Sequence, residues 1–289
     1  MVGTARIEHA LADALALGEA AGCPPRLAMA LRHAVFPGGA RVRPRLCLAV
    51  AHACGDDRPA VSDAAAASIE LLHCASLVHD DLPCFDDAAV RRGRPSVHKA
   101  FGERLAVLAG DALIVLAFQT LARGGVHAPE RLPGLLAQVC QAVGAPSGIV
   151  AGQAWECEAL IRLDEYQRAK TGSLFAGAAA VGAVAAGADP EGWRTVGERL
   201  GEAYQVADDI GDAAGDPQQL GKPVGRDAAL GRPSAARELG LAGAVSKLKQ
   251  LVADAIESIP PCRGGPELRA LILQEASRLL PEELARRAA

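Results

Sequence analysis

The sequence has few aromatic residues and no surplus of positive charge. Its 289 residues include five Phe, two Trp and two Tyr, and its formal net charge is −4. Proteins that bind nucleic acid through the phosphate backbone usually carry a basic surplus. We therefore expect no nucleic-acid partner, and a core built mainly from Ala, Leu and Val.

Paired cysteines and long apolar runs are also missing. The eight cysteines are scattered with no C-x-x-C pair, which removes support for zinc ribbons and dithiol redox motifs. The longest uncharged apolar stretch, residues 174–188, is shorter than the ~20 residues that a membrane-spanning helix needs. The first 17 residues include Arg6, Glu8 and Asp13, which do not suit a secretory signal. These features predict a cytoplasmic protein with reduced thiols and no membrane span.

Helical periodicity dominates what is present. Apolar residues recur at three- and four-residue spacing in six segments, whereas alternating β-branched runs are missing. The six segments are 7–17, 64–78, 105–121, 166–186, 193–210 and 244–259. Pro and Gly fall between them, and no change in composition marks a domain boundary. The sequence predicts one all-α domain, residues 1–289.

Two aspartate clusters each end an apolar helical segment. They are D-D-L-P-C-F-D-D at 80–87 and D-D-I-G-D at 208–212. Pro83 should end the first helix and let Asp86 turn toward Asp80, whereas Asp208 and Asp212 share a helix face. Adjacent carboxylates after an apolar run are costly unless a cation compensates them. Oxygen ligands of this kind suit Mg²⁺ completed by phosphate, although a single cluster could be a solvated helix end.

Basic residues lie beside these clusters and near Gly, Pro and Thr. They include the segment 38–44, Arg91, Arg92, Lys170, Lys222 and Arg226. Arg forms charge-assisted, often bidentate hydrogen bonds with phosphate. His73 precedes Asp80 by seven residues, on nearly the same helix face. A lone His in such a helix is usually a core residue, but its alignment with the aspartates favours a role in phosphate binding.

Seven segments, in order, resemble the trans-isoprenyl diphosphate synthase family, in particular its short-chain farnesyl and geranylgeranyl diphosphate synthases. They are GGARVRP (38–44), ELLHCASLVHDDLPCFDDAAVRRGRPSVH (70–98), LAVLAGDAL (105–113), GQ (152–153), KTGSLF (170–175), YQVADDIGD (204–212) and LGKPVGRDAALGRPS (220–234). The ordered set is specific to the family, whereas no single segment is. The resemblance implies an isoprenoid-synthase helical bundle around a central active-site cavity, and a homodimer.

The resemblance also implies roles for the matching residues. Three Mg²⁺ ions per active site would be held by Asp80, Asp81, Asp86, Asp208, Asp209 and Asp212. The allylic diphosphate would be bound by Arg91, Lys170 and Lys222, and the diphosphate of isopentenyl diphosphate by Arg43, His73 and Arg92. Thr171 and Gln205 would face the reacting carbons and, with Lys170 and the aspartates, complete the catalytic set.

The implied reaction is an ionisation, a condensation and an elimination. The allylic C–O bond breaks, isopentenyl diphosphate attacks the cation, and the departing diphosphate takes a proton. Water must be excluded, and residues 215–234 are a candidate lid. Ala40 stands where the family usually has Lys, which removes one phosphate contact, but no metal ligand is lost.

Product length is predicted from the helix that precedes Asp80. Ala75 and Ser76 lie ~6–7.5 Å back along that helix, and their small side chains leave room where short-product members carry an aromatic floor. We therefore expect geranylgeranyl diphosphate, the C20 product and a precursor for carotenoid biosynthesis. Alternatively, these residues only permit close helix packing and other helices supply the floor. The alternative function is a farnesyl diphosphate synthase.

Three other functions fit the sequence less well. A class I terpene cyclase shares a helical fold but generally steers cations with aromatic faces, which are scarce here. A non-catalytic subunit that modulates a prenyl synthase would be expected to lose one aspartate cluster, and both are present. A purely structural helical protein explains neither cluster.

Overall fold

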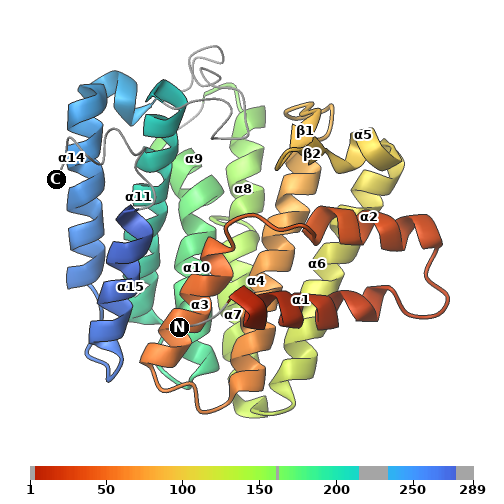
Figure 1. Ribbon diagram of the computed structural model, residues 1–289, viewed down its shortest axis with the longest axis horizontal. Coiled ribbons are helices and arrows are strands. Elements are labelled where there is room, and N and C mark those ends of the chain that lie inside the picture. The colour runs from red at the N-terminus through yellow and green to blue at the C-terminus, as the bar shows by residue number, and fades with distance from the viewer. Residues whose placement is uncertain (1–3, 161–162, 215–233, 278–289) are drawn as a thin grey trace. The chain divides into compact units, whose positions relative to one another are not determined.

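Helices account for almost all of the described chain (Figure 1). The computed structural model describes residues 4–160, 163–214 and 234–277. The α-helices are α1 (Thr4–Gly18), α2 (Pro25–Val35), α3 (Val42–Ala53), α4 (Pro59–Asp80), α5 (Val97–Phe101), α6 (Glu103–Gly125), α7 (Leu132–Val143), α8 (Ile149–Ala154), α9 (Leu163–Gln167), α10 (Ser173–Ala185), α11 (Glu191–Ala214), α14 (Ala235–Glu257) and α15 (Gly265–Ser277). The expectation of an all-α fold is confirmed.

Three short helical turns and one hairpin complete the described elements. The turns are the 3₁₀ segments η1 (Pro129–Arg131) and η2 (Trp155–Cys157) and the π-helical segment η3 (Arg168–Gly172). The strands β1 (Val90–Arg91) and β2 (Arg94–Pro95) form an antiparallel hairpin. The segment 166–186, predicted as one helix, is therefore wrong in detail, because η3 separates α9 from α10.

The chain divides into two compact units. The first takes in residues up to 140 and 180–189, and the second takes in 141–179 and the residues from 190 onward. The first aspartate cluster belongs to the first unit, and the second cluster belongs to the second. A single domain over residues 1–289 stays a prediction.

The first unit is built around α4 and α6, which run side by side (Figure 1). Pro59 occupies the first turn of α4, where its missing N–H costs nothing. Gly124 of α6 allows close approach, because a Cβ there would lie 2.2 Å from the Cβ of Ala64. Helices α1, α2 and α3 also pack on α4. This packing fixes the C-terminal end of α4, where the first aspartates lie.

The second unit is built around α11, which packs along α14 and against η3. Two glycines of α11 permit the contact with the segment that follows η3. A Cβ at Gly197 would lie 2.3 Å from the carbonyl oxygen of Phe175, and one at Gly201 would lie 2.9 Å from the Cα of Gly172. The second aspartate cluster is thus carried by a helix that lies directly on η3.

Two helices are long and apolar enough to cross a membrane by length and composition alone. They are α4, whose most apolar window is 78% buried, and α6, whose window is 44% buried. The extensive burial of α4 is also found in core helices of soluble proteins. The expected absence of a membrane span stays a prediction.

Candidate active site

The first aspartate cluster forms a turn at the end of α4. The helix ends at Asp80, and Pro83 lies in the turn that follows. The N–H of Asp86 donates to the carbonyl oxygen of Asp80 over 3.0 Å, so the chain reverses as the position of Pro83 predicted. Asp80 and Asp86, both half-buried, are thereby brought onto one turn.

Asp81 is buried and paired with Arg91 of the hairpin. The Arg91 Nε donates to both Asp81 carboxylate oxygens, at 3.0 and 3.2 Å. Burial disfavours the charged guanidinium, but the hydrogen bonds to Asp81 raise the pKa of Arg91 above its ordinary value. The charges of Asp80 and Asp86 act in the same direction. Asp81, predicted as a metal ligand, therefore also holds Arg91 beside the other two aspartates.

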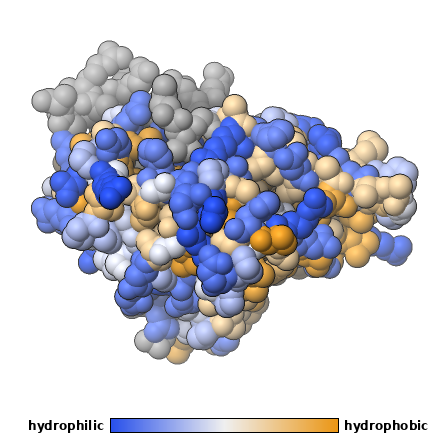
Figure 2. Space-filling view, turned by 90° about the horizontal axis from the view of Figure 1, so that it is seen from below, coloured by the Kyte–Doolittle hydropathy of each residue, from blue (hydrophilic) through white to orange (hydrophobic). Residues whose placement is uncertain are grey.

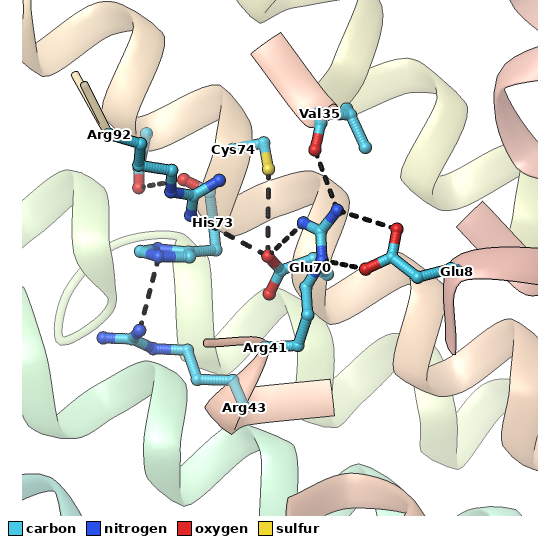
Figure 3. A network of polar contacts seen from close by, with 9 residues as sticks. Glu8, Val35, Arg41, Arg43, Glu70, His73, Cys74 and Arg92 are labelled. Carbon is cyan, nitrogen blue, oxygen red and sulfur yellow. Dashed lines mark hydrogen bonds and ion pairs between the residues drawn. The ribbon is translucent and has the colours of Figure 1, made fainter. Parts of the chain in front are cut away.

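Arginine side chains surround His73, which lies about two helical turns before Asp80 on α4 (Figure 3). An Nη1 of Arg43 lies 3.4 Å from the His73 Nε2. Burial and then the charges of Arg43, Arg92, Arg91 and Arg41 hold the pKa of His73 well below its ordinary value. The three residues predicted to bind the diphosphate of isopentenyl diphosphate are thus brought together, and the neutral imidazole sits in a positive field suited to an anion.

Arg41 belongs to a buried network that the sequence did not reveal (Figure 3). Its Nη1 donates to Glu70 at 2.7 Å and its Nε to Glu8 at 2.8 Å. Glu70 also lies 3.9 Å from the Nη2 of Arg92. The segment 38–44 was grouped with phosphate-binding cations, but the structure makes Arg41 a compensated core charge. A glutamate in the apolar segment before Asp80 was the available signal, because a buried carboxylate needs a partner.

The two glycines before Arg41 make room for arginine side chains. A Cβ at Gly38 would lie 2.1 Å from the Arg41 Cζ, and one at Gly39 would lie 2.9 Å from the Arg92 Nε. Ala40 itself is exposed. The Gly-Gly pair of the first matching segment therefore lets the Arg41 and Arg92 side chains lie against the backbone.

The two residues of the predicted chain-length pocket lie on α4. Ala75 is 2% exposed, and the hydroxyl of Ser76 donates to the carbonyl oxygen of His73 at 2.8 Å. Their role in product length stays a prediction.

In the second unit, Thr171, Gln205 and Asp209 form a hydrogen-bonded chain. The Thr171 hydroxyl donates to Gln205 Oε1 at 3.0 Å, and Gln205 Nε2 donates to Asp209 Oδ1 at 3.0 Å. The other Asp209 oxygen accepts the N–H of Ala235, at the start of α14, at 2.8 Å. Asp209 is buried, Asp212 is half-buried and Asp208 is exposed. Asp209, predicted as a metal ligand, therefore also fixes Gln205.

Gln205 and Asp209 line a cavity of about 510 Å³ in the second unit. Its other lining residues come mainly from α11, η3 and α14. Its size is within the range of small-molecule sites. Lys222, with most of the predicted lid at 215–234, lies outside the described residues.

The carboxylates fit Mg²⁺ only in combination with phosphate. Among the described residues, no group of three or more His, Cys, Asp or Glu side chains is placed to hold a metal ion alone. Mg²⁺ usually takes one or two carboxylates and completes its shell with water and substrate phosphates. A pair on one turn, Asp80 with Asp86, and a pair on one helix face, Asp208 with Asp212, suit that mode.

Comparison with known proteins decides the family. The sequence profile described as polyprenyl synthetase matches residues 24–264. The chain belongs to the polyprenyl synthetase family. A geranylgeranyl diphosphate synthase of Cereibacter sphaeroides is 53% identical over 98% of each chain, and one of Rhodobacter capsulatus is 51% identical over 95% of each chain.

A solved member of the isoprenyl synthases shares the fold. It is a geranyltransferase from Helicobacter pylori, complexed with magnesium and isoprenyl diphosphate. The TM-score is 0.78 at 27% identity, over 96% of this chain and 99% of that one. Together with the family match, this likeness confirms the predicted family and fold class.

Proposed function

We propose that this polyprenyl synthetase condenses isopentenyl diphosphate with allylic diphosphates and releases geranylgeranyl diphosphate. The observation that carries the proposal is the gathering of Arg43, His73 and Arg92 beside the aspartate turn of α4. The two relatives named geranylgeranyl diphosphate synthase support the C20 product. The scarcity of aromatic residues and the presence of both aspartate clusters count against a terpene cyclase and a modulating subunit.

The aspartates of both clusters would hold Mg²⁺, three ions per active site. Bound Mg²⁺ would supply the positive charge that stabilises a leaving diphosphate. Asp80 and Asp86 are the candidate ligands of the first cluster, and Asp208 and Asp212 those of the second. The magnesium in the Helicobacter pylori structure supports this assignment. Asp81 and Asp209 would contribute negative charge while keeping Arg91 and Gln205 in place.

The other side chains would bind the two substrates. Arg43, His73 and Arg92 would hold isopentenyl diphosphate, with the neutral His73 donating a hydrogen bond. Arg91, Lys170 and Lys222 would bind the allylic diphosphate. Arginine suits this task because its planar guanidinium matches phosphate oxygens. The Thr171 hydroxyl and the Gln205 amide would face the reacting carbons, and the departing diphosphate would accept the proton.

The enzyme would act as a cytoplasmic homodimer. Along α6, Val107, Leu108 and Val115 are 42%, 52% and 56% exposed. Figure 2 shows apolar side chains reaching the surface among polar ones on one face of the molecule. An apolar helix face of this kind is typical of a subunit interface. Carotenoid biosynthesis would be one pathway that uses the C20 product.

Replacing one aspartate of each cluster tests the proposal. Asp80→Ala and Asp208→Ala should each lower turnover by orders of magnitude with unchanged circular dichroism, since each removes a Mg²⁺ ligand. Asp13→Ala, at an exposed position of α1, is the matched control. Diphosphate release and product chain length would be measured with C5, C10 and C15 allylic substrates. Near-normal turnover in either variant would contradict the two-cluster assignment, and a C15 end product would make the enzyme a farnesyl diphosphate synthase.

A further inference from the structure

The carboxylate of Glu156 collects hydrogen bonds from three side chains. Lys170 Nζ lies 2.5 Å from Glu156 Oε1, the Tyr166 hydroxyl donates to the same oxygen at 2.7 Å, and Gln153 Nε2 donates to Oε2 at 3.0 Å. Glu156 lies in η2, directly after α8, and Lys170 lies in η3. Lys170 is a predicted substrate-binding residue, whereas Glu156, three residues after the Gly-Gln pair, has no predicted role.

The backbone around this carboxylate is closely packed. A Cβ at Gly152 would lie 2.4 Å from the backbone nitrogen of Lys170, so α8 and η3 meet through a glycine. The π-helical geometry of η3 is rare and frequently marks functional sites. The Lys170 ammonium also lies 5.6 Å from the centre of the Tyr166 ring. The Glu156 carboxylate, the Tyr166 ring and the closely packed backbone together restrict the Lys170 side chain.

We propose that Glu156 is a positioning residue that aims the Lys170 ammonium at the allylic diphosphate, an inference that rests on the proposed function. An ammonium has three donors, so one that is bonded to a carboxylate can also donate to phosphate oxygens. Lysine loses much rotamer freedom when it is fixed, and a side chain that is already held loses less on binding. Both side chains are only 21% exposed, and in a largely buried ion pair the desolvation cost offsets much of the attraction, so its main consequence is placement.

The same contact also allows the opposite effect on binding of the allylic diphosphate. A carboxylate beside the ammonium could compete with the diphosphate, and its removal would then tighten binding of the allylic substrate. Positioning predicts weaker binding after removal. The Michaelis constant of the allylic substrate therefore separates the two effects.

The experiment is a double-mutant cycle on Glu156 and Lys170. Each protein is assayed with Mg²⁺, once with varied allylic diphosphate and once with varied isopentenyl diphosphate. Glu156→Ala should raise the KM for the allylic substrate about five- to tenfold and leave that for isopentenyl diphosphate nearly unchanged. Glu156→Gln keeps an acceptor oxygen and should fall between Glu156→Ala and the wild type. Glu158→Ala, at an exposed position two residues along, should match the wild type.

In the Lys170→Gln background, Glu156→Ala should have no further effect, because a residue that acts through another is not additive with it. An unchanged or lowered allylic KM in Glu156→Ala, or full additivity in the cycle, would overturn the inference alone. So would a parallel rise of both KM values with a lowered melting temperature, which would indicate a merely structural role. An unchanged allylic KM in Lys170→Gln would instead overturn the role of Lys170, and with it the inference.

Discussion

Individual buried charges are compensated in pairs around the first aspartate cluster. Asp81 is paired with Arg91, and Glu70 with Arg41. Removing one member of a buried pair is strongly destabilising, whereas the intact pair adds little net stability. Burial raises the pKa of the nearby Cys74 thiol to about 12, so it stays neutral. Arg92 lies 3.9 Å from Glu70, so these paired carboxylates also help to place the cations near His73.

The lowered pKa of His73 predicts how the stability of the fold depends on pH. Its pKa is lowered in the folded protein by burial and by Arg43 and Arg92, whereas in the unfolded chain it is about 6.5. Below pH ~6.5 the unfolded chain binds a proton that the folded protein does not, so stability falls as pH falls. His73→Gln should flatten this slope in urea unfolding between about pH 5.5 and pH 7.5. His9→Gln, at an exposed position on α1, is the control, and equal slopes for the wild type and His73→Gln would contradict the assignment.

At the level of elements, the sequence predicted the helices and the turn that depend on local sequence patterns. The long periodic segments are found in α1, α4, α6, α11 and α14, and Pro83 correctly indicated the aspartate turn. Helix α3 was not predicted, because it is buried on most sides and has no amphipathic period. Helix α8 is too short to show an amphipathic period. The carboxylate partners of Arg41 and Lys170 lie 14 to 33 residues away in sequence, and only the tertiary fold brings them close.

The contact between α8 and η3 should be sensitive to one methyl group. In Gly152→Ala the new Cβ would lie 2.4 Å from the Lys170 nitrogen, so the two elements must separate. Overpacking of this kind costs about 1–3 kcal/mol, and a displaced Lys170 and Thr171 should reduce kcat/KM on the order of 10²-fold. Gly265→Ala is the control, because its Cβ would meet its nearest neighbour at 3.6 Å. Equal activity and melting temperature in the two variants would contradict the predicted clash.

Helix α4 carries the prediction about product length. Ala75→Phe combined with Ser76→Phe should shift the product from C20 toward C15, since two aromatic rings would close the space beside the helix. Chain-length analysis of the products measures the shift. Ala75 is buried, so the melting temperature should be recorded as well. An unchanged C20 product in a folded double variant would place the floor of the pocket on another element.

At the scale of the whole molecule, α6 differs from α4 in how much of its surface is buried by the rest of the chain. Its most apolar window is 44% buried, against 78% for α4, although it is the more hydrophobic helix. Among its exposed positions, Arg104, Val107, Leu108, Asp111 and Val115 follow three- and four-residue spacing and so share one face. Val107, Leu108 and Val115 are exposed apolar side chains on this face, alongside the charged Arg104 and Asp111, and exposed apolar surface is costly in water. A second copy of the chain is the occupant that the proposed homodimer supplies.

The last prediction therefore concerns assembly. In a two-fold dimer each residue of the interface occurs twice, so Val115→Glu would place two carboxylates in it. Leaving each buried without a partner costs at least about 1–3 kcal/mol, and the variant should sediment as a 29.7 kDa monomer. Val150→Glu introduces the same side chain at a position that is 61% exposed in α8, and it should sediment at the wild-type mass. A monomeric wild type would contradict the dimer, and binding of that monomer to lipid vesicles would assign the α6 face to a membrane surface instead.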